Sequence, residues 1–310
     1  MSERVMVVGA TGHLGREIVK ELLAEGYDVT ALIRPRPPSV DDRQRGLDQL
    51  IEAGVAVIPG GLDDEASLDR ACDGATAIIS CIDHRPDHLL MQAALGRAAV
   101  RAGTVKRIIP SQFGIDSRSY RRTRVGHGDA KRDVQGLLAE AGVALTFVHT
   151  NGLAAQWVGS LGQLGLPAPP LEEVEVYGRG NVPFSTVTVE DVARYAMRAA
   201  FDVNAVNRHV LIVPADNLLT QNDLIGLWEA KTGLVLNRRP VTNRDLDKRI
   251  ATLAGDSARR AELALAQLLR AAWIDGLGDG RRLPDVIELT AAYPDLDYVR
   301  ASDFLDRYLA

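Results

Sequence analysis

The chain has 310 residues, which is enough for two domains or for one extended α/β unit. Its 46% apolar and 25% charged residues are those of an ordinary globular enzyme, and the net charge of −5 argues against a nucleic-acid partner. The two cysteines favour a reducing, cytoplasmic location, and no Cys/His spacing indicates a metal site. No stretch approaches the ~18 apolar residues of a membrane span, so we expect no membrane partner.

Strands and helices alternate over the first half of the chain. The apolar patterns predict strands at residues 5–8, 29–33, 55–58, 75–80, 107–110 and 145–149. Helical spacing predicts helices between them, at residues 14–25, 47–53, 67–72, 89–102 and 131–141. This alternation is typical of an α/β protein with a doubly wound, parallel Rossmann sheet.

The regular alternation ends after residue 151. Residues 159–170 are rich in Gly and Pro and predict a loop, whereas 182–191 predict a strand that leads into a helix capped near Thr188. Helical patterns cover 218–232 and 244–273. We therefore predict a Rossmann domain over 1–155 with a returning segment at about 182–214, and a smaller, mostly helical substrate-binding region formed by 156–181 and 215–310.

A glycine-rich turn joins the first strand to the first helix, with the sequence G-A-T-G-H-L-G. Gly9 permits the tight turn, Gly12 lets the backbone approach a pyrophosphate, and Gly15 lets the helix pack closely on the strand. The helix N-terminus supplies free N–H groups and a positive dipole end. The turn predicts a dinucleotide site that also includes Thr11, His13 and Leu14. The alternative is a structural turn that binds nothing.

The end of the second strand indicates which dinucleotide is bound. NAD-binding proteins carry an acidic residue there to bond the ribose 2′-hydroxyl, but this chain has Arg34. An arginine can fork onto a 2′-phosphate, and Ser39 and Arg43 follow in the next loop. The predicted cofactor is therefore NADPH, whereas the alternative is that these arginines are solvated loop charges.

Three further segments carry a family resemblance. They are K-R-I-I-P-S-Q-F-G-I-D at 106–116, K-R-D-V-Q-G-L-L-A-E-A-G-V-A-L-T-F-V at 131–148, and Y-P-D-L-D-Y-V-R-A-S-D-F-L at 293–305. With the glycine turn, they make the chain resemble the isoflavone, phenylcoumaran benzylic ether and pinoresinol/lariciresinol reductases, within the NmrA-like group. Arg34 and Arg43 fall on the 2′-phosphate positions of that family. The chain departs from it at Gln112, where plant members have Glu, at Gln135 and Gly136, where they have paired arginines, and at Leu153, where they have a bulkier residue.

The resemblance places the catalytic lysine at Lys131. The residues alone agree, because Lys131 opens a helix at the crevice of the sheet, where a desolvated lysine can act as a general base. The family's lysine is thought to assist removal of a phenolic proton, so that a benzylic C–O bond breaks and the quinone methide accepts hydride from NADPH. His127, four residues earlier, could share its helix face, although we favour a surface histidine.

The remaining site residues are also expected around this crevice. Ser80 and Phe113 are predicted to contact the cofactor together with Lys131, and Ile115, Asn151 and Leu153 are predicted to contact the substrate. The resemblance implies an NADPH-dependent reductase of a small aromatic substrate, and we favour a lignan of the pinoresinol type. Isoflavone reduction, or an NmrA-like NADP(H) sensor without turnover, is the alternative. A homodimer is the assembly considered.

Overall fold

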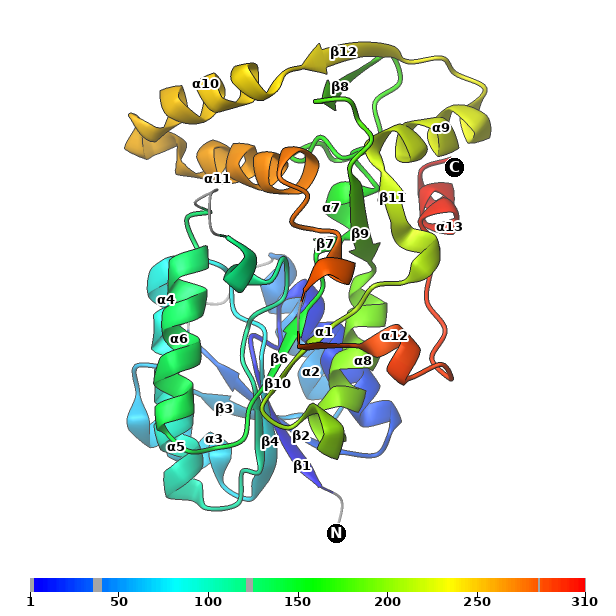
Figure 1. Cartoon of the computed structure of the whole chain (residues 1–310). Helices are drawn as coiled ribbons and strands as arrows, with labels where there is room; N and C mark the ends of the chain where they lie inside the picture. The colour runs from blue at the N-terminus through cyan, green and yellow to red at the C-terminus, as the bar shows by residue number, and fades with distance from the viewer. Residues whose placement is uncertain (1–2, 36–40, 121–124, 284, 310) are drawn as a thin grey trace.

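The computed structural model describes residues 3–35, 41–120, 125–283 and 285–309. Figure 1 shows a lower part with a sheet between helices, and an upper part in which α9 to α11 lie above that sheet. Ser39, which we predicted to contact the cofactor, lies outside the described residues.

The lower part is built on parallel strands. Five of them lie in the order β3-β2-β1-β4-β5: β1 (Arg4–Val8), β2 (Asp28–Ile33), β3 (Ala56–Pro59), β4 (Ala75–Ser80) and β5 (Arg107–Ile109). A parallel bridge between Ile108 and Leu145 continues this sheet toward β6 (Thr146–His149), which is followed by β10 (Arg208–Leu211) and β13 (Val286–Glu288). The predicted α/β fold with a doubly wound parallel sheet is confirmed.

Helices cover both faces of this sheet. One layer contains α1 (His13–Ala24) and α8 (Val189–Phe201), and the other contains α3 (Glu65–Cys72), α5 (Ala93–Ala102) and α6 (Gly128–Glu140); α2 (Asp42–Glu52) follows β2. The apolar residues of β1 alternate between the two layers. Val5 and Val7 pack in the core with α1 and α8, whereas Met6 and Val8 pack in the core with α3 and α5. Strands buried on both faces explain the continuous apolar runs of the sequence.

The upper part has its own apolar core, centred on Trp157, Trp228 and Trp273. Its elements are β7 (Gly152–Leu153), α7 (Ala154–Trp157), β8 (Glu173–Tyr177), β9 (Pro183–Val187), β11 (Leu218–Thr220), α9 (Gln221–Thr232), β12 (Asn237–Val241), α10 (Asn243–Ala254), α11 (Arg260–Leu269) and α13 (Ala301–Leu305). The short helix α12 (Leu289–Ala292) follows β13 and packs in the lower core instead. Two small sheets, β11-β9-β7 and β12-β8, join these elements.

The predicted helix over 89–102 is wrong as a single element. The structure has α4 (Pro86–Met91) and then α5, with Gln92 between them. The Gln92 amide donates to the carbonyl of Leu89 at 3.2 Å, and its oxygen accepts from the backbone N–H of Ser111 at 2.7 Å. The side chain of Gln92 therefore satisfies the backbone of the helix break and ties it to the loop after β5.

Two further helix predictions need correction. The segment 218–232 begins as the strand β11, because Leu218 to Thr220 pair with β9, and Thr220 then caps α9. The segment 244–273 divides at Gly255 and Asp256 into α10 and α11 and ends in a π-helical turn over Arg270–Ile274. By contrast, the cap at Thr188 is confirmed, since its hydroxyl accepts from the N–H of Asp191 at 3.1 Å.

The division of the chain into two regions stays a prediction. The parallel sheet receives β10 from the returning segment, but it also receives β13, which lies within 215–310. The strand β9 lies in one of the small sheets instead. Within the described residues, no helix has the length and apolar character required to cross a lipid bilayer.

Candidate active site

The glycine turn after β1 packs against the end of β4. Gly9 has φ +82°, and a Cβ there would lie 2.5 Å from the carbonyl oxygen of Cys81. A Cβ on Gly15 would lie 2.2 Å from the carbonyl oxygen of Gly9. Gly12 differs, because a Cβ there would meet only the Gly9 oxygen, at 3.3 Å. Two glycines are therefore required by the fold, and Gly12 leaves the space that a bound phosphate needs.

The N-terminus of α1 suits an anion. The helix begins at His13 after Gly12, no side chain caps its first turn, and that turn contains no acidic residue. Thr11 and Leu14 are half-buried beside the turn, whereas His13 is exposed. Uncapped N–H groups and the positive end of the helix dipole favour a pyrophosphate at this position.

Two arginines lie beyond the end of β2, as predicted. Arg34 follows β2 directly and Arg43 is in the first turn of α2, and both are exposed. Neither forms an ion pair within the described part of the chain, although Arg16 nearby is paired with Asp42 at 3.1 Å. Two guanidinium groups that no described carboxylate engages fit a 2′-phosphate.

Ser80 and Phe113 lie at the carboxyl ends of neighbouring strands. Ser80 is the last residue of β4; its hydroxyl is fully buried and has no hydrogen-bond partner among the described residues. A buried polar group without a partner is a candidate contact for a bound molecule. The side chain of Phe113 is buried in the core beneath the crevice. Their roles toward a cofactor stay predictions.

Lys131 lies in the first turn of α6 and is only 1% exposed. Its Nζ donates to the carbonyl oxygens of Phe113 at 2.7 Å and Gln112 at 3.2 Å. Burial lowers the pKa of Lys131 to about 7, against the opposing effect of the Asp116 carboxylate. A neutral amine has two N–H groups, so the two carbonyls satisfy both donors and leave the lone pair to accept a proton.

Two histidines lie close to Lys131. A Cβ on Gly114 would lie 3.5 Å from Lys131 Nζ and 3.9 Å from His84 Cε1. The ring of His127 meets that of His84 edge-on, with centroids 5.1 Å apart, and also contacts Tyr120. His127 is half-buried in these contacts, and the interpretation of a surface histidine without a catalytic role stays a prediction. The sequence alone assigned no catalytic role to His84. Its position in the loop after the fourth strand could have indicated one, because such loops line the crevice of a doubly wound sheet.

The predicted substrate residues surround Gly114 and the end of β6. The N–H groups of Thr150 and Asn151 both donate to the carbonyl of Gly114 at 3.1 Å. Asn151 has φ +52°, and its buried amide has no partner among the described residues. Ile115 packs in the upper core and Leu153 against the lower one. The structure brings these segments together, while substrate contact stays a prediction.

A buried polar network lies behind the site. Asp116 pairs with Arg118 at 2.6 Å and lies 3.6 Å from His149 Nε2, which is 2.9 Å from His209 Nδ1. The ligand-type atoms of Asp116, His149 and His209 lie within 4.8 Å of one another. However, the carboxylate is already engaged by an arginine, which disfavours a cation at the same oxygens. The absence of a metal site therefore stays a prediction.

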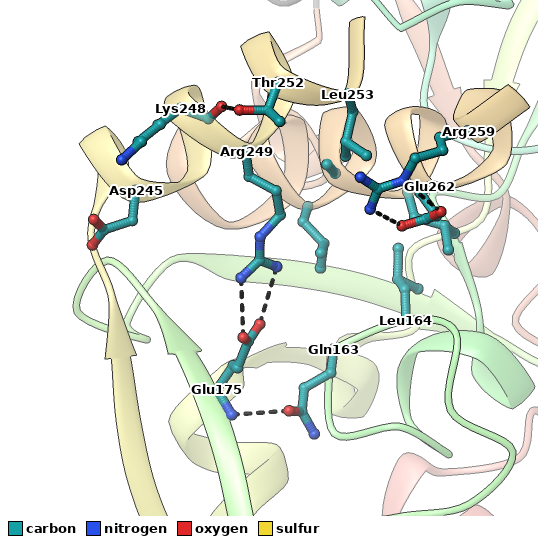
Figure 2. Close-up of a pocket in the computed structure, with 13 residues that line it drawn as sticks. Gln163, Leu164, Glu175, Asp245, Lys248, Arg249, Thr252, Leu253, Arg259 and Glu262 are labelled. Atoms are coloured by element: carbon teal, nitrogen blue, oxygen red, sulfur yellow. Dashed lines mark hydrogen bonds and ion pairs between the residues drawn. The ribbon is translucent and has the colours of Figure 1, made fainter. Parts of the chain in front are cut away.

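A separate cavity of about 600 Å³ lies between α10, α11 and the loop before β8. Figure 2 shows Arg249 forked onto Glu175 and Arg259 paired with Glu262 inside it. None of its lining residues belongs to the crevice around Lys131. Most of the charged side chains in this cavity form ion pairs with one another. We therefore place the candidate active site in the crevice around Lys131 and not in this cavity.

A doubly wound sheet, an uncapped helix behind a glycine turn and a buried lysine at the same edge define a Rossmann-type oxidoreductase. The family model for the NmrA-like family matches residues 1–270. The chain therefore belongs to the NmrA-like family, and the predicted resemblance is confirmed.

Known relatives of this chain are reductases. Pinoresinol reductase 1 from Arabidopsis thaliana is 31% identical over 317 residues, which cover 99% of this chain and 97% of the relative. The isoflavone reductase homolog IRL from Zea mays is 31% identical over 313 residues, covering 99% and 98%. The solved structure of AtPrR2 with NADP+ and (+)pinoresinol has a TM-score of 0.90 and 28% identity, covering 99% of both chains.

Proposed function

We propose that this chain is an NADPH-dependent reductase of lignan-type aromatic substrates, which cleaves the benzylic ether of pinoresinol or lariciresinol. The similarity to pinoresinol reductase 1 and to AtPrR2 over nearly the whole chain supports the substrate class and the cofactor. The observation that carries the proposal is Lys131, whose buried amine is held by two carbonyls at the edge of the crevice.

When bound, NADPH supplies the hydride that this reaction needs. The glycine turn and α1 would hold its pyrophosphate, and Arg34 and Arg43 its 2′-phosphate. Lys131 in its neutral form accepts the proton of the substrate phenol. The resulting phenolate pushes its electron pair through the ring, so that the para benzylic C–O bond breaks and the ether oxygen leaves with the bonding pair. The benzylic carbon would then accept the hydride of bound NADPH. The ammonium of Lys131 returns its proton to the phenolate, and the expelled alkoxide takes up a second proton to give the alcohol.

Two other functions predict different results with the same purified chain. An isoflavone reductase would oxidise NADPH with an isoflavone and not with (+)-pinoresinol, and a sensor would bind NADPH without oxidising it with either. We expect loss of NADPH absorbance and formation of the ring-opened alcohol with (+)-pinoresinol or lariciresinol. Binding of NADPH without turnover on any of these compounds would favour the sensor.

The assembly and the location of the protein stay predictions. We predict a homodimer in the cytoplasm, where Cys72 and Cys81, both free thiols, would remain reduced. Sedimentation equilibrium of the purified chain measures its assembly directly, and a monomer at micromolar concentration would contradict the dimer.

A further inference from the structure

His84 and Lys131 face the same gap in the crevice. Gly114, at φ +122°, has no side chain to fill the space between them, and a single Cβ there would contact both Lys131 Nζ and His84 Cε1. Lys131 comes from α6, whereas His84 comes from the loop after β4. Both groups therefore border the same space beside Gly114, and a para-substituted substrate ring that contacts Lys131 there would lie close to His84.

The proposed reaction needs a proton transfer at each end of such a ring: removal from the phenol at one end and delivery to the ether oxygen at the other. Lys131 takes a proton from the phenol, and at the same stage the ether oxygen leaves with an electron pair. A departing aliphatic alkoxide is strongly basic, since its conjugate acid has a pKa near that of water, ~15.7. Lys131 holds the phenolic proton at that stage, so another group must protonate the alkoxide.

We propose that His84 is the general acid that protonates the aliphatic alkoxide as it departs from the benzylic carbon. This assignment rests on the proposed function. The imidazolium N–H proton moves to the alkoxide oxygen and gives the alcohol, and His84 becomes neutral. Lys131 later returns its proton to the phenolate, so each turnover consumes one NADPH and one solvent proton. His84 is an exposed residue of the loop after β4, so solvent can recharge it after each turnover.

The charges around His84 favour this order of events. The positive charge of Lys131, desolvation and His127 lower the pKa of His84, whereas the Asp83 carboxylate raises it. While Lys131 is neutral, the largest of these effects is absent, so the pKa of His84 is higher than when Lys131 is charged. When Lys131 takes the phenolic proton, its new charge makes His84 a stronger acid as the alkoxide forms. The two groups thus titrate as a coupled pair.

Neighbouring groups suit this role less well. His127 is half-buried, so it has less contact with solvent than the exposed His84 and is recharged less readily. The Tyr120 hydroxyl is buried, which raises its pKa. Asp83 is paired with Arg85 and His88. The edge-on contact of His127 with His84 instead makes His127 a positioning residue.

The first test compares two leaving groups in the His84→Gln variant. For (+)-pinoresinol, which loses an alkoxide, kcat/KM should fall by the ~10²–10⁴-fold typical of a lost general acid. For an aryl benzylic ether of the phenylcoumaran type, which loses a phenoxide with a conjugate-acid pKa of ~10, the loss should be much smaller. The matched control is His88→Gln, on the adjacent helix α4, which should retain wild-type rates. Equal losses on both substrates, or no loss, would overturn the assignment.

The pH profile gives an independent result with (+)-pinoresinol. Wild-type kcat/KM should fall at high pH as the Lys131–His84 pair loses its shared proton, and this limb should be absent in His84→Gln. If the wild-type protein turns over (+)-pinoresinol but the high-pH limb of kcat/KM is unchanged in His84→Gln, the role of His84 is rejected. The proposed reductase function would still stand. No turnover by the wild-type protein on any benzylic ether would reject the reductase itself.

A titration without cofactor or substrate tests the coupling. The Cε1–H signal of His84 can be followed by NMR in the wild-type protein and in Lys131→Met. Removing the lysine should move the midpoint of His84 to higher pH. An unchanged midpoint would show that the two groups do not interact, and would overturn the assignment whatever the catalytic rates.

Discussion

The amide of Gln135 donates to the side-chain oxygen of Gln112 at 3.1 Å, and the amide of Gln112 in turn donates to the backbone carbonyl of Lys131 at 3.1 Å. The family resemblance implies Glu and Arg at these two positions in the plant enzymes. A charged pair is thus replaced by a neutral amide pair of matching reach. Both amides lie beside Lys131, the proposed base, so we expect the pair to act as one unit on the surroundings of Lys131.

Restoring the charge should shift the pH dependence of the reaction. Gln112→Glu places a carboxyl group next to Lys131, and once ionised it favours the ammonium form and raises the lysine pKa. Because the neutral amine is the base, the acidic limb of kcat/KM should move to higher pH. Adding Gln135→Arg should move the limb back toward wild type, and an unmoved limb in the single variant would contradict this account.

The same single variant should also be less stable. An ionised carboxylate cannot donate to the carbonyl of Lys131, so the variant loses the hydrogen bond of the Gln112 amide, which is worth ~0.5–1.5 kcal/mol. Urea unfolding of the single and double variants measures this loss. The double variant should recover part of it, because the introduced guanidinium would pair with the new carboxylate; a double variant as unstable as the single one would show that the two sites do not act together.

Much of the fold could be predicted from the sequence because the signals are local. The strands through β6 are short apolar runs between helical patterns, and the glycine turn marks the first strand and helix. The break at Gln92 could not be predicted, since the apolar spacing of a helix continues through it and its cause is a hydrogen bond to Ser111. The return of β13 to the sheet also depends on pairing with distant residues.

The site divides in the same way. Lys131 could be proposed because it lies in the first turn of a helix at the carboxyl edge of the sheet, and the glycines because their motif is contiguous. The carbonyls that hold its amine, and the approach of His84 across Gly114, join segments far apart in sequence. Contacts between side chains on opposite sides of a crevice produce no periodic pattern in the sequence. Only the three-dimensional structure shows these contacts.

The burial of Lys131 should make stability depend on pH. Its pKa is about 7 in the folded protein, below the ~10.4 of an unfolded chain, so between these values the unfolded state binds more protons. Stability contributed by this group therefore rises with pH across that window, by up to ~1.4 kcal/mol per pH unit. The difference in unfolding free energy between wild type and Lys131→Met should increase from pH 7 to pH 9. A constant difference would place the folded pKa outside this window.

Removing the amine should also stop catalysis without emptying the cofactor site. In Lys131→Met, turnover of (+)-pinoresinol should fall by the ~10²–10⁴-fold expected for a lost general base. The affinity for NADPH, measured by calorimetry, should change little, because the glycine turn and the arginines lie on other elements. Unchanged turnover would remove Lys131 from the mechanism.

Arg34 should set the preference between the two nicotinamide cofactors. A hydrogen-bonded charge pair with the 2′-phosphate is worth ~1.5–3 kcal/mol, so NADPH should bind more tightly than NADH by a corresponding factor. Arg34→Ala should weaken NADPH much more than NADH. The matched control is Arg97→Ala, an exposed arginine on α5, which should change neither affinity. Equal affinities of the wild-type protein for the two cofactors would rule out this role.

The last prediction concerns the free phenol of the substrate. If Lys131 acts by removing a phenolic proton, only the phenolate can push electrons through the ring and expel the ether oxygen. Methylating both phenols of pinoresinol should therefore abolish reduction. Binding should survive in part, because burial of the two aromatic rings dominates affinity and methylation leaves those rings unchanged.

The assay compares pinoresinol with its di-O-methyl ether. NADPH loss reports reduction, and competitive inhibition of pinoresinol turnover reports whether the methylated compound still enters the site. Inhibition without reduction is the expected result, because the ligand is bound but has no proton for Lys131 to remove. Rapid reduction of the methylated compound would exclude the quinone-methide route, since its ring oxygen cannot become a phenolate. Neither reduction nor inhibition would mean that the added methyl groups exclude the ligand, and that the phenols contribute to binding as well as to chemistry.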